Sequence, residues 1–270
     1  MNEFLPAHYV ESIQRLALGI ECTDPLIRSR IGWPVRVTRD GSPFPIPSWK
    51  RDPDASRWEV PTVLEVLPRS DSCRHAVLLK STTAEPIGLR IVDRSQRFVP
   101  RRLSIRLDEP IGGGRRVRPA LFPGAAYPIP PGAVGVRGRI LRNGEPMRWA
   151  RAEARRTTDD VLVGRGFGDE HGEFVLVLEA EAGRGADLIL PLTVTVIVFG
   201  PDVEADPDDF PDAAIDPLWD LPVEEAVIGP IGEEVLAGER LPAGYVSRPG
   251  STRDVEFSWH GFVREEFDFS

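Results

Sequence analysis

The stretch Leu192-Thr193-Val194-Thr195-Val196-Ile197-Val198-Phe199 is the strongest strand signal in the chain. It is rich in β-branched residues, which favour the extended backbone of a sheet. Segments before it alternate apolar and polar residues or form short apolar runs, and they predict strands over 134–140, 150–155, 161–163 and 174–178. The second half of the chain is therefore predicted to form a β-sandwich.

The first half of the chain carries the same kind of pattern. Strands are predicted there over 35–37, 63–67, 76–79, 89–92 and 103–107. Turn-rich pieces such as Asp40-Gly41-Ser42-Pro43 separate these strands, which fits an antiparallel sandwich of about ninety residues. Near the N-terminus, apolar residues recur at helical spacing, so a short amphipathic helix is predicted over His8–Leu18.

The composition supports an all-β fold with two domains. The 270 residues include 27 prolines and 25 glycines spread along the chain, which leaves few stretches long enough for a regular helix. The run Gly112-Gly113-Gly114 and the proline-rich segment 127–132 predict a linker over 108–132. The linker separates an N-terminal domain over 1–107 from a second domain over 133–270. Both are expected to be sandwiches of immunoglobulin-like or transthyretin-like type.

Two features are expected to extend the second domain. Residues 201–225 form an acidic insertion that is rich in aspartate and proline. The tail alternates apolar and polar residues over 255–259 and 262–269, which predicts a C-terminal hairpin around His260-Gly261.

A series of turn motifs lies at the start of the second domain. They are Gly138-Arg139-Ile140, Asn143-Gly144-Glu145-Pro146, Ala150-Arg151-Ala152 and Gly168-Asp169-Glu170-His171-Gly172-Glu173-Phe174. Asn143-Gly144 supplies the positive φ angles of a tight hairpin turn. Asp169 can accept hydrogen bonds from backbone amides in a turn closed by Gly172, which delivers Phe174 into the core. With these motifs, residues 133–199 resemble the carboxypeptidase regulatory-like domain, a small transthyretin-like β-sandwich.

This resemblance implies a folding, spacer or protein-contact role. The family has no catalytic residues of its own, so none is carried over to this chain. Similar regulatory-like modules occur in accessory proteins of phage-tail-like contractile injection machines. An accessory subunit of such a bacterial assembly is the setting that the resemblance suggests, by analogy of fold.

Known patterns for catalysis and metal binding are missing from the sequence. The four histidines are His8, His75, His171 and His260, and they show no His-x-x-His or HExxH spacing. There is no Gly-x-Ser-x-Gly nucleophile elbow, and Cys22 and Cys73 form no CxxC pair, so both are read as isolated thiols. The sequence therefore predicts a protein that is not an enzyme and that needs no cofactor or metal.

Charge is distributed unevenly along the chain, whose formal net charge is -9. Residues 185–239 contain many carboxylates and no lysine or arginine, whereas 90–118 is rich in arginine. Such poles can attract unlike ends of neighbouring proteins and raise encounter rates at low salt. The partner-binding residues predicted from these poles are Arg94, Arg97, Arg101, Arg102, Asp206, Asp208, Asp209, Asp212 and Trp219.

Other interpretations of the two poles remain open. Charge runs are often solvated surface with no partner. The segment 206–212 could bind calcium through clustered oxygens, but it lacks the glycine and glutamate of an EF-hand loop. Nucleic-acid binding is disfavoured because the total charge is negative and only Phe98 lies among the arginines.

The sequence thus predicts a non-catalytic structural or adaptor protein that binds other protein subunits, including copies of itself. No signal peptide or apolar membrane span is evident, so a cytoplasmic location is expected. The alternative is a sandwich that binds carbohydrate or another ligand. Exposed, coplanar rings among Trp33, Trp49, Trp58 and Trp149 would favour that alternative.

Overall fold

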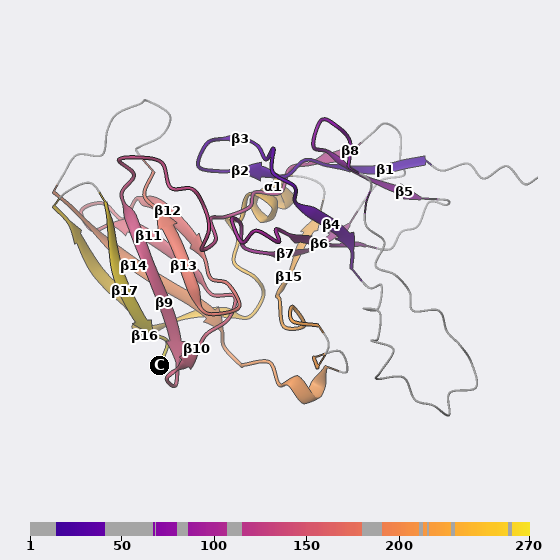
Figure 1. The fold of residues 1–270 in the computed structure, drawn as a ribbon. Coiled ribbons are helices and arrows are strands. Elements are labelled where there is room, and N and C mark those ends of the chain that lie inside the picture. Colours follow the sequence, from indigo (N-terminus) through magenta and orange to yellow (C-terminus); the bar gives the residue numbers. More distant parts are fainter. Residues whose placement is uncertain are drawn as a thin grey trace, which may run out of the picture.

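The computed structural model describes residues 15–40, 67, 69–79, 86–106, 115–179, 191–210, 213–214, 216–227, 230–258 and 261–270. Over these residues the protein is nearly all-β, with a single α-helix, α1 (Pro230–Ala237), and a short 3-10 helix, η3 (Pro207–Asp209). Figure 1 shows the strands of the N-terminal part on one side of the molecule and those of the C-terminal part on the other. The predicted all-β class is confirmed.

Among the described residues, three sheets form the N-terminal side. One sheet has the order β15-β7-β6-β4 and comprises β4 (Arg36–Arg39), β6 (Ile87–Val92), β7 (Arg101–Arg106) and β15 (Val223–Val227). A second has the order β5-β1-β8 and comprises β1 (Arg15–Ile20), β5 (His75–Leu79) and β8 (Arg115–Val117). The third pairs the short strands β2 (Thr23–Asp24) and β3 (Ser29–Arg30).

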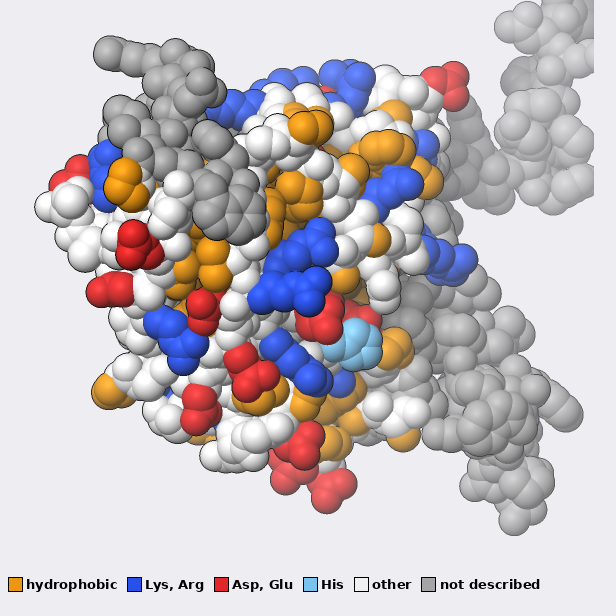
Figure 2. All heavy atoms as spheres, turned by 60° about the vertical axis from the view of Figure 1, so that its left-hand side comes forward, with side chains coloured by type: hydrophobic (Ala, Val, Ile, Leu, Met, Phe, Trp, Pro, Cys, Tyr) orange, Lys and Arg blue, Asp and Glu red, His pale blue; other side chains and the backbone are white. Residues whose placement is uncertain are grey.

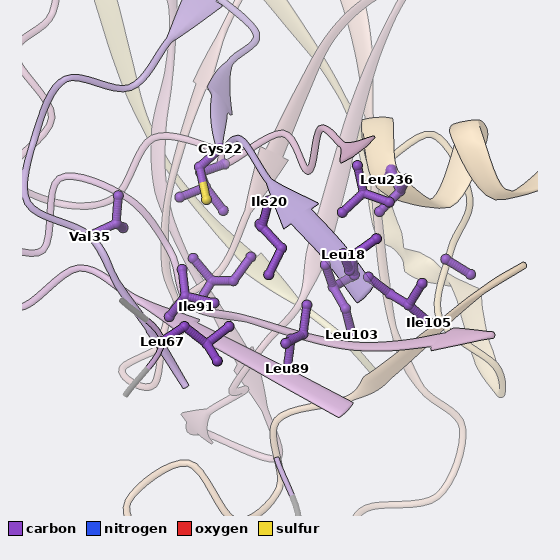
Figure 3. Close-up of a cluster of buried hydrophobic side chains, with 14 of the residues drawn as sticks. Leu18, Ile20, Cys22, Val35, Leu67, Leu89, Ile91, Leu103, Ile105 and Leu236 are labelled. Carbon is purple, nitrogen blue, oxygen red and sulfur yellow. The ribbon is translucent and has the colours of Figure 1, made fainter. Parts of the chain in front are cut away.

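One hydrophobic cluster draws side chains from both larger sheets of this side. Leu18 and Ile20 of β1 are fully buried and lie beside Leu89 of β6 and Leu103 of β7 (Figure 3). Leu236 of α1 enters the same cluster. The alternation of apolar residues along β6 and β7 therefore reports which face of the sheet is buried.

On the C-terminal side, the described strands form two sheets. In one, β9 (Gly135–Arg142) pairs with β10 (Glu145–Pro146), β13 (Glu173–Val177) and β17 (Phe262–Asp268). The other has the order β12-β11-β14-β16 and comprises β11 (Arg151–Arg156), β12 (Leu162–Phe167), β14 (Leu192–Pro201) and β16 (Tyr245–Phe257). The strongest strand signal of the sequence thus becomes β14, an interior strand.

The C-terminal side has its own hydrophobic cluster. Val194, Val196 and Val198 of β14 are fully buried and share the cluster with Phe267 of β17. Close approach of the two sheets depends on small residues: a Cβ on Gly164 would lie 2.7 Å from a backbone oxygen. A larger residue at this position would therefore push the sheets apart.

The predicted local turns are confirmed. Asn143 and Gly144 have φ angles of 53° and 82° and connect β9 to β10. The Asp169 carboxylate accepts hydrogen bonds from the backbone N–H groups of His171 (2.8 Å) and Glu173 (3.0 Å). Gly172 has a φ of 71°, and Phe174 is buried in the core two residues later.

The N-terminal helix predicted over 8–18 is wrong where the structure describes it, because Arg15–Ile20 is strand β1. Its residues 8–14 lie outside the described ranges. β1 pairs with β5 on one side and with β8 on the other. Leu18 and Ile20 lie two residues apart and are both fully buried, so the tertiary pairing prevailed over the helical spacing of this segment.

The predicted C-terminal hairpin is also wrong. β16 pairs with β14, whereas β17 pairs with β9 in the other sheet of the C-terminal side. Both strands alternate apolar and polar residues, and alternation alone does not identify the partner strand. Residues 259–260 at the predicted turn lie outside the described ranges.

The stretch predicted as a linker over 108–132 contributes to the N-terminal side. It contains β8, and its Leu121, Phe122 and Tyr127 side chains are buried. The Tyr127 hydroxyl donates a 2.7 Å hydrogen bond to Asp24 at the end of β2. Residues 107–114, with the triple glycine, lie outside the described ranges. In the part of the chain that is described, no helix has the length and hydrophobicity needed to span a bilayer.

Candidate functional site

The two charge poles of the sequence meet inside the molecule. β15 lies within residues 185–239, the acidic region, yet it joins the N-terminal sheet as a parallel neighbour of β7, with Glu224 beside Leu103. Figure 1 shows β15 on the N-terminal side of the molecule, although the strands that precede and follow its region in sequence lie on the other side. The acidic region therefore connects the two sides.

A buried cluster of three charged residues lies at this junction. Glu224 on β15 is 2% exposed, Arg101 on β7 is 0% exposed, and Arg151 on β11 is 3% exposed. The two Glu224 carboxylate oxygens accept hydrogen bonds from Arg101 Nη2 (2.6 Å) and Nε (3.0 Å). Arg151 Nη2 donates to the same carboxylate at 3.2 Å. The Glu224 carboxylate thus accepts hydrogen bonds from one arginine on each side of the molecule.

Backbone carbonyl oxygens accept the other hydrogen bonds that Arg101 donates. Arg101 donates to the carbonyl oxygens of Ala120 (2.7 Å), Val235 (2.6 Å) and Leu236 (2.8 Å). A buried arginine that donates two hydrogen bonds to one carboxylate and three to backbone carbonyls is fixed in one orientation. Arg101 therefore ties β15 and the end of α1 to β7.

Aromatic packing surrounds the same cluster. The guanidinium carbon of Arg151 lies 3.7 Å from the ring centroid of Phe167 on β12. Phe167 in turn stacks on Phe122 from the N-terminal side, with centroids 3.9 Å apart and planes at 8°. Burial lowers the pKa of the Arg151 guanidinium, although Glu224 counteracts this shift. The cluster is a buried contact between the two sides.

A second ionic cluster attaches the acidic region further along the sheet. Arg90 on β6 donates to Asp216 (2.5 Å) and Asp40 (2.7 Å), and Arg102 on β7 also pairs with Asp40. Burial would raise the pKa of the Asp40 carboxyl, but the hydrogen bonds and charges of the two arginines outweigh burial and lower it. Asp40 is therefore an anion that stabilises the folded state.

We expect Asp40→Asn to lower the free energy of unfolding by about 2 kcal/mol at neutral pH, because two arginines lose their shared carboxylate. A depressed folded-state pKa gives stability that is complete above the ordinary aspartate pKa of about 4 and is lost as pH falls through the folded value. The difference between wild type and variant should therefore shrink in acid. Urea titrations at about pH 7 and pH 3 measure it.

Asp71→Asn is the matched control for this variant, because Asp71 is an exposed aspartate in a turn. It should change stability by less than about 0.5 kcal/mol at either pH. A loss for Asp40→Asn that stays the same in acid would contradict the assignment.

A third polar cluster surrounds Trp149, which is 2% exposed. Its indole Nε1–H donates to Asp220 at 2.8 Å, and Arg148 pairs with the same carboxylate at 2.7 Å. Burial raises the pKa of Asp220, although the indole and the arginine oppose this shift. The contact holds the acidic region against the start of β11.

The predicted partner-binding residues fall into different environments. Arg101 is fully buried and saturated within the chain, so the prediction that it binds a partner at the surface is corrected. Arg102 is partly buried against Asp40, and Trp219 is partly buried with its ring centroid 5.0 Å from that of Phe210. Asp212 lies outside the described residues.

The remaining predicted residues are accessible. Arg94 is exposed and Arg97 is partly exposed in the turn before β7. Asp206, Asp208 and Asp209 are exposed at η3. The structure does not bring these two groups together, so each remains available to another molecule.

Sequence reasoning missed Glu224, Arg151 and Asp216. The burial of Arg101 could have been predicted from the sequence. Side chains two residues apart in a strand lie on the same face, and Leu103 and Ile105 mark the buried face of this strand. No comparable signal marks Glu224, since its partner strand lies more than one hundred residues earlier.

A cleft with a volume of about 970 Å³ opens between the two sides, beside β12 and the end of α1. Its charged lining consists of Asp24, Arg28, Arg118, Arg165, Glu179 and Glu239. Arg28 pairs with Glu179 at 3.8 Å and Arg165 with Glu239 at 4.0 Å, and the lining contains no histidine or cysteine. Within the described ranges, no group of three or more histidine, cysteine or acidic residues is placed to hold a metal ion.

The aromatic residues named for carbohydrate binding are not arranged as a platform where they are described. Trp149 is buried, and Trp33 is 43% exposed. Trp49 and Trp58 lie outside the described residues. Figure 2 shows basic side chains gathered near the centre of the face that lies to the left in Figure 1, with acidic side chains beside and below them.

No known family model matches the chain, and no curated protein matches it. Solved structures with some likeness include a 9R-lipoxygenase from Cyanothece PCC8801, at 14% identity over 51% of this chain and 16% of that chain, with a TM-score of 0.24. The Bacillus anthracis TIE protein aligns at 9% identity over 93% of this chain and 33% of that chain, with a TM-score of 0.24. A leucine-rich repeat protein from Bacteroides thetaiotaomicron VPI-5482 aligns at 9% identity over 93% of this chain and 25% of that chain, with a TM-score of 0.21.

This chain spans about a third or less of the length of each of these proteins. Likeness at such TM-scores carries no argument about fold or function.

Proposed function

We propose that the protein is a non-catalytic structural or adaptor subunit that acts through contacts with other proteins. The observation that carries this proposal is the division of its charged residues into two sets. One set is buried and joins the two sides of the molecule, as Arg101, Glu224 and Arg151 do. The other set is exposed and unlike in sign, with arginines before β7 and carboxylates around η3.

The proposal includes two β-sandwich domains, the second of the carboxypeptidase regulatory-like type. Two separate hydrophobic clusters, each with side chains from two sheets, support this division into two domains. The turns at 143–144 and 169–172 support the family resemblance of the second domain. An accessory role in a large bacterial assembly, such as a contractile injection machine, is the setting proposed by analogy.

A binding experiment tests the adaptor function. The immobilised full chain is expected to retain a partner from native cell extract at about 50 mM salt and to release it at about 500 mM, because exposed charges are screened at high ionic strength. A variant with Asp206→Asn, Asp208→Asn and Asp209→Asn should retain at least about tenfold less of it.

The matched control is the triple variant Glu256→Gln, Glu266→Gln, Asp268→Asn, which removes three exposed carboxylates from β16 and β17 instead. It should retain as much partner as the wild type. Failure to retain any stoichiometric partner at low salt would overturn the proposed function, as would turnover of a substrate by the purified chain.

A further inference from the structure

A tryptophan is presented to solvent between β3 and β4. The Trp33 side chain is 43% exposed, and the guanidinium carbon of Arg97 lies 3.8 Å from its ring centroid. Arg69 Nη2 donates to the carbonyl oxygens of Gly32 (3.1 Å) and Trp33 (3.2 Å). The stacking and these hydrogen bonds hold the ring in a fixed position at the surface.

The turn that carries Arg97 is also fixed. The Asp93 carboxylate is buried and accepts hydrogen bonds from the backbone N–H groups of Ser95 (2.9 Å) and Arg97 (3.1 Å). The backbone N–H of Gly124 donates to the carbonyl of Arg97 at 2.7 Å. A preorganised surface loses little conformational entropy when a partner binds to it.

The arginines of this surface have unused donors. In the part of the chain that the structure describes, the guanidinium groups of Arg94 and Arg97 form no ion pair with a carboxylate. A guanidinium stacked on a ring keeps its edge free, and that edge fits a carboxylate through two parallel hydrogen bonds. Tryptophan and arginine are also among the residue types that are enriched at interface hot spots. We call Trp33, Arg69 and Arg97, together with the exposed Arg94 from the same turn as Arg97, the Trp33 patch.

The same chain carries a surface of complementary chemistry. Residues 202–210, the acidic segment, are all exposed. Asp206, Asp208 and Asp209 have no arginine partner among the described residues. Apolar side chains lie between the acids, since Val203 is 80% exposed and Phe210 is 40% exposed. In Figure 1 this segment, with η3, lies at the bottom of the molecule, away from β3 at the top.

We propose that the Trp33 patch of one copy binds the acidic segment of a second copy. Carboxylates of the segment pair with Arg94 and Arg97, and an apolar side chain of the segment contacts the exposed Trp33 ring. The two surfaces are unlike and lie on different parts of the chain, so the contact is head-to-tail, and repeated contacts build a ring or a filament. This inference rests on the proposed function and names the partner as the chain itself.

Charge reversal tests the contact. The purified full chain should sediment as oligomers at about 50 mM salt and as a monomer at about 500 mM. The double variant Arg94→Glu, Arg97→Glu and the double variant Asp206→Arg, Asp208→Arg should each self-associate at least about 30-fold more weakly. An equimolar mixture of the two variants should recover oligomers, because each then meets a surface of opposite charge.

The matched control for the arginine variant is Arg240→Glu, Arg264→Glu, which makes the same change in net charge as Arg94→Glu, Arg97→Glu at exposed arginines elsewhere and should leave association unchanged. A chain that is monomeric at low salt overturns the inference, and so does a mixture that fails to associate. If such a monomer still retains a different protein from extract, the adaptor function stands and only the self-contact is wrong. If it retains none, both fail.

Discussion

Glu224→Gln is expected to lower the free energy of unfolding by about 3–5 kcal/mol, a large part of the 5–15 kcal/mol that holds a typical domain folded. The substitution keeps the size of the side chain and removes its charge. Arg101 and Arg151, both buried, would then face each other without a compensating anion. Urea unfolding followed by tryptophan fluorescence measures the loss, because Trp149 is buried near this junction.

Glu225→Gln is the control, since Glu225 is the next residue on β15 and its side chain is exposed. We expect it to change stability by less than about 0.5 kcal/mol. Equal losses for the two variants, or a loss below about 1 kcal/mol for Glu224→Gln, would show that the buried carboxylate does not hold the junction together.

Several local features of the fold could be predicted from the sequence. Alternation along 103–107 and 192–199 predicted strands where the structure has β7 and β14, because each of these strands has one face in a hydrophobic cluster. The turns at 143–144 and 169–172 were predictable because their hydrogen bonds and φ angles are local. Features set by neighbouring residues were therefore accessible to sequence reasoning.

Long-range pairing was not accessible in this way. β15 has adjacent glutamates and only five residues, and its partner β7 lies more than one hundred residues earlier. The sequence therefore predicts an acidic insertion over 201–225 that extends the second domain, although Glu224 and Asp216 within it are each 2% exposed and bind arginines of the N-terminal side. Part of the charge segregation in the sequence reflects ion pairs inside the chain, between arginines of the N-terminal side and carboxylates of the acidic region.

A chain truncated after Gly132 is expected not to fold cooperatively. It retains β1 to β8 but lacks β15 and α1, which leaves the edge of β7 uncovered and Arg101 without Glu224. It also lacks Val235 and Leu236, which belong to the N-terminal hydrophobic cluster. An unpaired buried charge costs about 3–5 kcal/mol, and each missing apolar side chain costs about 1.5–3 kcal/mol. Together these losses are comparable to the stability of a whole domain.

Fusion of residues 216–240 to the truncated chain through a flexible linker of about 20 residues should restore cooperative unfolding, because a linker of this length adds little closure entropy. Circular dichroism during urea titration distinguishes a cooperative transition from a gradual one. The same fusion with Glu224→Gln should unfold gradually, since Arg101 again lacks its anion. If the truncated chain unfolds as cooperatively as the fusion, the N-terminal sheet is stable without β15. The boundary between two independent domains would then lie before residue 132, and the acidic region would be an accessory to the fold and not the element that completes it.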